Sequence, residues 1–294
     1  MMKTFVGAEK LRSILNKPGI IAAPGAFDAL SAKLIEKTGF PAVYMTGFGV
    51  SATRAALPDF GLLTRSEFVD QITQMTRAVH IPLIADADTG FGNALQLERT
   101  MQLYEQAGAA AVQLEDQDVN RRCGHLAGKA VIPTADMVTK IQIMKAAQLN
   151  PETVLIARTD ARAVADLDEA LRRGEAYLEA GADVLFVEAP QSIEELERVA
   201  AEFRGAWLLA NMPEGGLTPY LSYRDLESLG YKIAIYPVTT LFSATRAMLD
   251  ALTELRGQGR LVTPERHVDF AAFVEIIGAP AYLEKIAHYE TLRK

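Results

Sequence analysis

The chain has 294 residues, enough for one large domain, and 49% of them are hydrophobic, which permits a sizeable core. Charged residues make up 23%, close to the globular norm, and this argues against disorder. The formal net charge is −7 and no run of Lys or Arg exceeds a pair, so we expect neither a nucleic-acid partner nor an anionic membrane partner.

Cysteine usage and the amino-terminal segment bear on the compartment. Cys123 is the only cysteine, which rules out an intrachain disulfide and fits a reducing cytosol. Met1 to Lys17 contains no apolar region followed by a cleavage signal, and no uninterrupted apolar run reaches the ~20 residues of a spanning helix. We therefore expect a soluble, cytoplasmic protein.

Short apolar runs alternate with longer amphipathic runs along the chain. The short runs predict strands at Gly19–Ala23, Ala42–Thr46, Pro82–Ala85, Ala111–Leu114, Val154–Ala157, Val184–Val187, Trp207–Ala210 and Ile233–Tyr236. The longer runs predict helices at Arg65–Val79, Ala94–Ala107, Thr134–Gln148, Leu167–Ala180 and Ser192–Phe203. This alternation predicts a closed parallel (β/α)8 barrel. An open doubly wound sheet is the alternative, but no Gly-x-Gly-x-x-Gly opens a helix after the first strand.

Helical periodicity continues after the last predicted strand. It covers Thr239–Arg256, then the surroundings of Pro264–Ile277 and Ala279–Leu292. A single barrel does not need the last two stretches. We therefore expect one barrel domain over residues 1–294 with a helical extension over about 257–294, and packing on a neighbouring subunit would account for the surplus.

In such barrels the chemistry lies on the loops after the carboxyl ends of the strands. Polar residues recur there, namely Thr46, Asp86, Asp88, Glu115, Asp116, Arg158, Asp160, Glu188 and Asn211. One acid after a strand often only caps the next helix, but several in succession are not explained in that way. Carboxylates that converge on a buried sheet need compensation. We therefore predict that Asp86, Asp88 and Glu115 hold Mg²⁺, directly or through water.

Two further positions bear on substrate binding. The small residues around Thr46 and Gly47 allow backbone N–H groups to approach an anion. Arg158 would be a fixed positive charge on the barrel rim that could bind a substrate carboxylate through two hydrogen bonds. A salt bridge from Arg158 to Glu188 or Asp160 is the alternative, and the two interpretations are compatible.

The segment Cys123-Gly124-His125 follows the fourth predicted strand and is preceded by two arginines. A lone cysteine is more often a small core residue than a catalyst. This one lies in a basic, glycine-containing loop without apolar periodicity, where flanking cations would lower the pKa of the thiol and suit it to acid/base catalysis. Spacing alone leaves both interpretations open. His125 would tune the thiol or hold the loop.

Four motifs in this order resemble the isocitrate lyase/phosphoenolpyruvate mutase superfamily over roughly Pro24 to Pro237. They are Asp86–Gly92, Glu115–Gln117, Arg122–His125 and Ala157–Asp160. Within that superfamily, Asn211–Gly216 and Tyr44–Gly47 look more like the 2,3-dimethylmalate lyase and petal death protein members than like the 2-methylisocitrate lyases.

The resemblance implies a barrel whose last helix is swapped between subunits, in a homotetramer built from dimers. It implies Mg²⁺, with Mn²⁺ as a substitute, held by Asp59, Asp86, Asp88 and Glu115, and a Cys123 loop that closes over the substrate. It implies substrate-binding roles for Thr46, Gly47, Phe48, Gly124, Glu188, Asn211 and Pro237, with Arg158 at a substrate oxygen. One departure concerns Arg121, which stands where the lyases usually carry Lys, and an arginine does not readily shuttle a proton.

The sequence and the resemblance together predict a Mg²⁺-dependent carbon–carbon lyase. Its substrate would be a di- or tricarboxylate with a 2-hydroxyl group, such as 2,3-dimethylmalate or 2-methylisocitrate, and its products a 2-oxo acid and a carboxylate. Cys123 would protonate the departing carbon, while Tyr44 or a metal-bound water would take the hydroxyl proton. The alternatives are an oxaloacetate hydrolase or decarboxylase, a carboxyphosphonoenolpyruvate or phosphoenolpyruvate phosphonomutase-type enzyme, against which Cys123 argues, and a ligand-binding protein without turnover.

Overall fold

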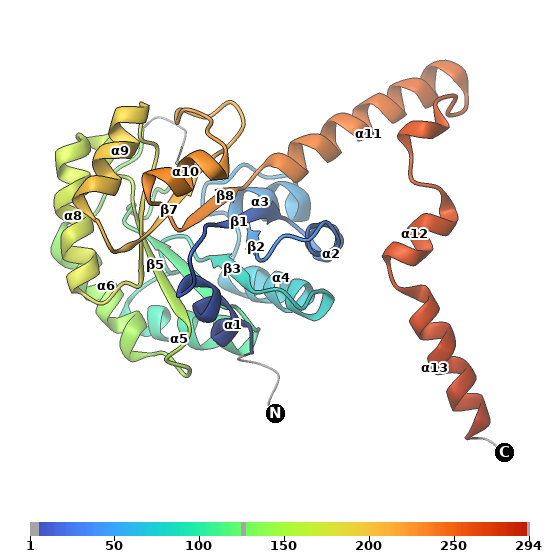
Figure 1. Ribbon diagram of the computed structural model, residues 1–294, viewed down its shortest axis with the longest axis horizontal. Coiled ribbons are helices and arrows are strands. Elements are labelled where there is room, and N and C mark those ends of the chain that lie inside the picture. The colour runs from blue at the N-terminus through green and yellow to red at the C-terminus, as the bar shows by residue number, and fades with distance from the viewer. Residues whose placement is uncertain (1–5, 125–127, 293–294) are drawn as a thin grey trace. The chain divides into compact units, whose positions relative to one another are not determined.

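The computed structural model describes residues 6–124 and 128–292. Its strands are β1 (Ile21–Ala26), β2 (Val43–Met45), β3 (Leu83–Asp86), β4 (Ala111–Glu115), β5 (Val154–Thr159), β6 (Val184–Val187), β7 (Trp207–Asn211) and β8 (Ile233–Tyr236). Every strand pairs in parallel with the next, and β8 closes on β1, so the sheet is the predicted barrel. Helices surround these strands in the view of Figure 1.

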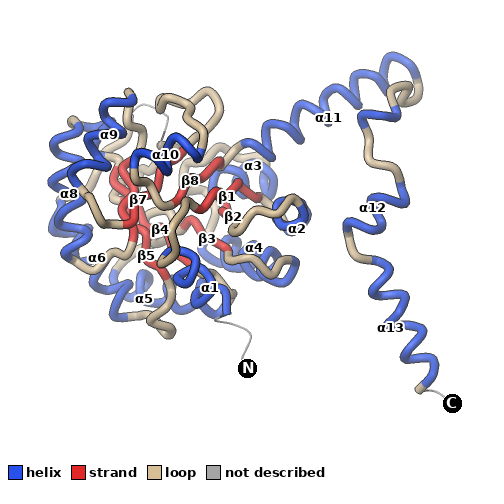
Figure 2. Tube along the Cα trace, viewed as in Figure 1, coloured by secondary structure: helices blue, strands red, loops and turns tan. Residues whose placement is uncertain are grey.

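The helices follow the strands in alternation (Figure 2). They are α1 (Val6–Leu15), α2 (Ala29–Lys37), α3 (Gly47–Ala55), α4 (Arg65–Ala78), α5 (Ala94–Gln106), α6 (Thr134–Ala146), α7 (Ala161–Val164), α8 (Leu167–Glu179), α9 (Ile193–Glu202), α10 (Tyr223–Leu229), α11 (Thr239–Gln258), α12 (Phe270–Ile276) and α13 (Ala279–Thr291), with a 3-10 turn at Pro264–Arg266. The five helices predicted between strands are α4, α5, α6, α8 and α9, each confirmed to within two residues at either end.

Alternate residues of each strand build two kinds of core. One set, which includes Ile84, Ile156 and Phe186, forms a cluster that also contains Leu11 and Leu15 of α1. The residues between them in sequence belong to clusters shared with the surrounding helices. Because strand side chains alternate between two faces, the first set fills the barrel and the second attaches the helices to it.

The first strand extends further than predicted, because Pro24 and Gly25, a pair typical of turns, lie inside β1. Pro24 pairs with Tyr236 of β8, and a Cβ atom added to Gly25 would lie 2.2 Å from the carbonyl oxygen of Pro237. The glycine is therefore needed where the two strands approach each other closely.

Strand register sets which side chains become neighbours at the carboxyl end of the barrel. Asp86 of β3 pairs with Gln113 of β4, and Glu115 of β4 pairs with Arg158 of β5. Residues paired in this way project to the same side of the sheet. The register thus places the acids of β3 and β4 beside the arginine of β5.

The chain divides into two compact units, Met1–Leu241 and Phe242–Lys294, and the boundary falls early in α11. The helices of the second unit have no buried residues, and exposed apolar side chains recur along them. Among the described residues, no helix has the length and apolar character needed to cross a membrane.

Candidate active site

Four buried acids lie around the carboxyl ends of β3 and β4. Asp86 ends β3, Asp88 follows it, Glu115 ends β4, and Asp59 lies in the loop between α3 and α4. None of them is more than 5% exposed. Asp88 has a φ of 48°, a conformation that Asp tolerates better than most residues, and its carbonyl accepts a hydrogen bond from the N–H of Glu115 at 3.0 Å. The loop after β3 is thereby tied to the end of β4.

Burial raises the pKa values of three of these acids. The pKa of Glu115 rises to about 7, and those of Asp86 and Asp88 also rise, because desolvation and the neighbouring carboxylates outweigh the effect of Arg121. These acids are therefore harder to ionise together than carboxyl groups in water.

Arg121 is the cation that lies among them. Its Nη1 is 2.5 Å from Asp59 Oδ1 and 3.2 Å from Asp88 Oδ1, and its Nε is 2.7 Å from Glu115 Oε1. The side chain is only 4% exposed. Arg121 therefore joins three of the four predicted metal ligands through a single guanidinium group.

The donor set suits a hard divalent cation such as Mg²⁺, which prefers carboxylate oxygens and water. Asp88 Oδ1 and Glu115 Oε2 are buried and accept no hydrogen bond from any described residue. Over residues 6–124 and 128–292, however, no three acidic, His or Cys side chains converge as a ready-made metal site. The residues present fit a cation in kind and charge, and Arg121 pairs with three of the four acids.

The end of β2 borders the same cluster. Thr46 caps α3, where its hydroxyl accepts a hydrogen bond from the N–H of Gly49 at 3.2 Å. A Cβ atom added to Gly47 would lie 2.7 Å from Asp86 Oδ2, so only glycine allows this approach. The amino end of α3, which favours anions, therefore begins beside the acids.

Tyr44 of β2 points into the barrel. Its hydroxyl donates a hydrogen bond to Gln113 Oε1 at 3.3 Å, and Gln113 Nε2 lies 3.5 Å from Asp86 Oδ1. Burial and the charge of Asp86 raise the pKa of Tyr44 well above its ordinary value. The phenol thus lies in a hydrogen-bonded chain that leads to Asp86, and its predicted role as the base stays a prediction.

Arg158 of β5 occupies the centre of a second group. Its Nε and Nη2 donate to the two oxygens of Asp160 at 2.9 and 3.0 Å. Its Nη1 lies 3.5 Å from Glu115 Oε2, and its Nη2 lies 3.9 Å from Glu188 Oε1. Asp160 therefore holds one edge of the guanidinium group, and Nη1 connects this group to the acid cluster.

The Cys123–Gly124 segment lies directly against Arg158 and Glu188. A Cβ atom added to Gly124 would be 2.2 Å from Glu188 Oε1 and 2.4 Å from Arg158 Nη2. Gly124 is buried, and Cys123 next to it is partly exposed. The structure thus brings Gly124, the residue that follows the predicted thiol, against the predicted carboxylate-binding arginine.

Lys129 holds this segment from the other side of the loop. Its Nζ donates to the carbonyl oxygen of Gly124 and, at 2.9 Å, to Asp160 Oδ1. The side chain of Lys129 is 2% exposed. Lys129 was not predicted from the sequence, although a lysine close after Gly124 in a basic loop is a signal that could have pointed to it.

The remaining predicted residues fall at the same end of the barrel. Asn211 ends β7 and its Nδ2 donates to Glu188, at 3.3 Å from each oxygen. Pro237 follows β8, and Phe48 lies in the first turn of α3. His125 lies outside the described residues, so its predicted role stays a prediction.

Asp116, next to Glu115, has a structural role. Its carboxylate accepts hydrogen bonds from Thr159 Oγ1 at 2.7 Å, Tyr177 Oη at 2.7 Å and Arg173 Nη1 at 3.1 Å. These partners come from β5 and α8, so Asp116 connects the end of β4 to the outer layer. Such connections are not visible in sequence spacing.

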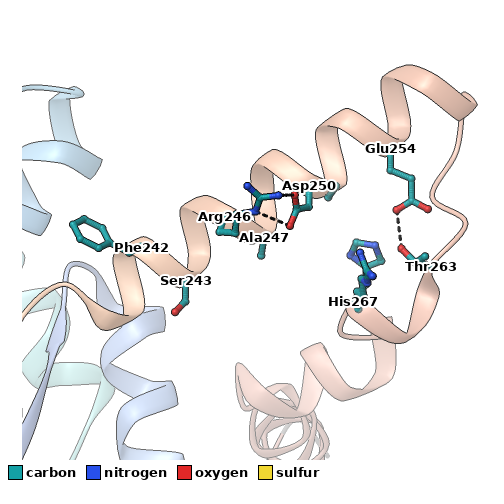
Figure 3. Close-up of a pocket in the computed structure, with 10 residues that line it drawn as sticks. Phe242, Ser243, Arg246, Ala247, Asp250, Glu254, Thr263 and His267 are labelled. Atoms are coloured by element: carbon teal, nitrogen blue, oxygen red, sulfur yellow. Dashed lines mark hydrogen bonds and ion pairs between the residues drawn. The ribbon is translucent and has the colours of Figure 1, made fainter. Parts of the chain in front are cut away.

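A hollow of about 710 Å³ lies in the second unit, and none of the predicted site residues lines it. Figure 3 shows its lining, with an Arg246–Asp250 ion pair and a hydrogen bond from Thr263 to Glu254. It contains no group that the predicted chemistry uses.

Several known proteins resemble this chain in sequence and in fold. Residues 11–256 match the phosphoenolpyruvate phosphomutase family. The chain is 45% identical over 284 residues to the 2,3-dimethylmalate lyase of Eubacterium barkeri, which covers 96% of both chains. The structure of an oxaloacetate acetylhydrolase with the inhibitor 3,3-difluorooxalacetate matches with a TM-score of 0.93 at 34% identity, over 97% of this chain and 98% of that one. A phosphonopyruvate hydrolase complex with oxalate and Mg²⁺ matches with a TM-score of 0.87 at 29% identity, over 96% and 99%.

Proposed function

We propose that this chain, which belongs to the phosphoenolpyruvate mutase/isocitrate lyase superfamily, is a Mg²⁺-dependent lyase that cleaves the C2–C3 bond of a 2-hydroxy dicarboxylate. The observation that carries the proposal is the contact of the Cys123–Gly124 segment with Arg158 and Glu188, beside the acid cluster. It supports the proposal because the residue next to Cys123 lies against groups suited to a carboxylate and a cation.

Binding of the substrate is assigned to two positive features. Arg158 would attract one substrate carboxylate through the N–H groups that do not donate to Asp160. The amino end of α3 at Gly47 would attract another carboxylate. Mg²⁺, or Mn²⁺ in its place, would be held by Asp59, Asp86, Asp88 and Glu115 and would supply positive charge to the oxygen on C2. Glu188 and Asn211 would orient the substrate through hydrogen bonds.

The proton movements follow from the bond that breaks. A base takes the proton of the C2 hydroxyl, the C2–C3 bond electrons move to C3, and C2 becomes the carbonyl carbon of a 2-oxo acid. The enediolate left at C3 takes a proton from Cys123 Sγ, and the resulting thiolate is reprotonated from solvent. For 2,3-dimethylmalate the products are pyruvate and propionate, which together contain all atoms of the substrate. Backbone contacts at Gly124 keep the thiol close to this carbon.

The likeness to 2,3-dimethylmalate lyase favours an alkylmalate as the substrate. 2-Methylisocitrate would undergo the same cleavage with a larger group on C3. A second candidate is hydrolysis of oxaloacetate to oxalate and acetate, which the likeness to oxaloacetate acetylhydrolase favours. In the proposed site both reactions would use Arg158 and the cation, and the pocket around C3 would decide between them.

Product identification separates these reactions. The full chain with Mg²⁺ is incubated with 2,3-dimethylmalate, 2-methylisocitrate, oxaloacetate or phosphonopyruvate, and the products are identified by NMR. We expect a 2-oxo acid and a monocarboxylate from an alkylmalate, with loss of turnover in EDTA and a decrease of about 10²–10⁴-fold in Cys123→Ser. If oxaloacetate is the only substrate converted, and oxalate is its product, the protein is the hydrolase and not the lyase.

We further propose that the chain works as a homotetramer in which the C-terminal helices cover a second copy. Helices α2, α4, α5, α6, α8, α9 and α10 pack in succession around the barrel. An apolar groove of about 340 Å³ remains between α2 and the β8 region, lined by Leu34, Phe40, Tyr220 and Tyr236 among others. The exposed apolar side chains of α12 and α13, such as Phe270 at 86%, suit such a groove on another subunit.

Light scattering on the full chain tests the assembly. We expect the mass of four chains, and dissociation in a variant with Phe270→Asp and Tyr282→Asp. A monomeric mass for the unaltered chain at micromolar concentration would refute the assembly while leaving the proposed reaction in place.

A further inference from the structure

The loop after β3 carries two of the four acids in a strained backbone conformation. Asp86 ends the strand and Asp88 follows it, and the chain then turns through Gly90 and Phe91 before α5 begins. Asp88, Gly90 and Phe91 have φ values of 48°, 94° and 63°. A positive φ is unfavourable for a bulky aromatic residue, and such a conformation persists only where the surroundings hold it. The neighbours of this loop therefore decide where its two carboxylates lie.

Tyr104 of α5 holds the start of the loop. Its hydroxyl donates a hydrogen bond to the carbonyl oxygen of Asp86 at 3.1 Å, and its side chain is fully buried. The centroid of its ring lies 6.4 Å from that of Phe91, which in turn packs edge to face on Phe68 at 5.3 Å. Tyr104 thus fixes the peptide group after Asp86 and supports the strained aromatic residue.

Lys140 of α6 holds the middle of the loop. Its Nζ donates a hydrogen bond to the carbonyl oxygen of Thr89 at 3.0 Å. The carbonyl before it, that of Asp88, accepts from the N–H of Glu115 at 3.0 Å. Three carbonyl groups of the loop are therefore fixed by three different elements, namely α5, β4 and α6.

Backbone fixed in this way sets the direction of the carboxylates of Asp86 and Asp88. Mg²⁺ demands nearly octahedral geometry, and loss of a group that orients a metal ligand typically lowers affinity by about 10–100-fold. Tyr104 and Lys140 donate to backbone oxygens, so these two hydrogen bonds leave the carboxylate oxygens to a cation.

We propose that Tyr104 and Lys140 are positioning residues for the divalent cation: they hold the strained loop so that Asp86 and Asp88 face one ion. This inference rests on the proposed metal site. It deepens that proposal because it extends the site from the strand ends to two helices that surround the barrel.

The charge of Lys140 gives the test a sign. Its ammonium group lies within electrostatic range of Glu115, one of the proposed ligands. A positive charge there repels a divalent cation, so loss of the charge alone would strengthen Mg²⁺ binding. Loss of the hydrogen bond to Thr89 would weaken it. The direction of the change in Lys140→Met therefore separates positioning from electrostatics.

The chain offers a matched control for each residue. Tyr177 of α8 is as buried as Tyr104, and its hydroxyl donates to Asp116 at 2.7 Å. Lys145 lies on α6 like Lys140, and its Nζ donates to Asp183 at 3.1 Å. Tyr177→Phe and Lys145→Met remove the same chemical groups from hydrogen bonds that do not involve the loop after β3.

Calorimetry with MgCl₂ or MnCl₂ measures cation affinity in the full chain without any substrate. We expect Tyr104→Phe and Lys140→Met to bind Mg²⁺ about tenfold more weakly, and Lys140→Arg, which keeps a donor for Thr89, to stay within about threefold of the unaltered protein. Tyr177→Phe and Lys145→Met should stay within about twofold, even where their melting temperatures fall as far.

Each outcome supports or overturns the inference. If Tyr104→Phe and Lys140→Met bind Mg²⁺ as tightly as the unaltered protein or more tightly, positioning is refuted and the metal site stands. Equal weakening in the two controls would also refute it, because general loosening of the fold would explain the change. If only one variant is weakened, the role of the other residue is refuted.

Failure of the proposed cofactor gives a different result. If the unaltered protein binds neither Mg²⁺ nor Mn²⁺, the inference fails together with the metal site. Circular dichroism checks that each variant is folded. Tyr104→Phe keeps the aromatic ring in place, so it keeps the inference testable if Lys140→Met does not fold.

Discussion

Replacement of Gly124 by alanine should lower turnover about 100-fold without unfolding the protein. The added Cβ would lie 2.2 Å from Glu188 Oε1 and 2.4 Å from Arg158 Nη2, whereas ordinary contacts begin near 3.4 Å. Both side chains are buried and paired, Glu188 with Asn211 and Arg158 with Asp160, so they cannot simply rotate away. The Cys123 segment must therefore retreat by roughly 1 Å, and a misplacement of ~1 Å can cost ~10²-fold in rate, or about 2.7 kcal/mol of activation free energy.

The assay compares kcat for the alkylmalate substrate, Mg²⁺ affinity and the melting temperature. Gly257→Ala in α11 is the control, because its added methyl group meets nothing within 4 Å. We expect kcat to fall in Gly124→Ala alone, with Mg²⁺ affinity within about twofold of the unaltered protein, since the acids are not touched. An unchanged kcat in a folded Gly124→Ala protein would refute the assigned position of Cys123.

Three further predictions concern the supporting groups. Lys129→Met removes the donor to Gly124 and Asp160, so kcat should fall by about 10-fold, the equivalent of one charge-assisted hydrogen bond, while calorimetry shows unaltered Mg²⁺ binding. Tyr177→Phe deletes a 2.7 Å hydrogen bond to buried Asp116 and should lower the free energy of unfolding in urea by about 1–2 kcal/mol, with kcat retained. EDTA should abolish turnover yet leave the circular dichroism spectrum intact, since Arg121 still pairs with Asp59, Asp88 and Glu115; unfolding on chelation would contradict this.

The barrel could be predicted because each strand carries its own signal. All eight strands and five of the helices between them were visible as apolar runs and amphipathic periods, and the polar strand ends at Asp86, Glu115 and Arg158 lie at one end of the barrel as the topology requires. Helices α1, α2, α3, α7 and α10 were not predicted. They are only four to ten residues long, which gives periodicity few turns in which to appear.

Long-range side-chain contacts could not be predicted from spacing. Asp59 was predicted from the resemblance alone, since nothing in its loop distinguishes it from a surface acid. It is 62 positions from Arg121 in the sequence, and only the fold shows that the two residues are paired. Likewise, sequence gives the charge of Arg121 and Lys129 but not the direction in which a loop turns them. Those directions decide that both cations are buried on acids rather than solvated.

One NMR experiment tests the central claim most directly. The protein is incubated in D₂O with 2,3-dimethylmalate and Mg²⁺, and the products are followed as they form. The proposed reaction predicts pyruvate and propionate in equal amounts, with a single deuteron on C2 of propionate, because a solvent-exchanged Cys123 thiol delivers it. Intact 2,3-dimethylmalate together with conversion of oxaloacetate to oxalate and acetate would contradict the lyase and leave the hydrolase as the function of this site.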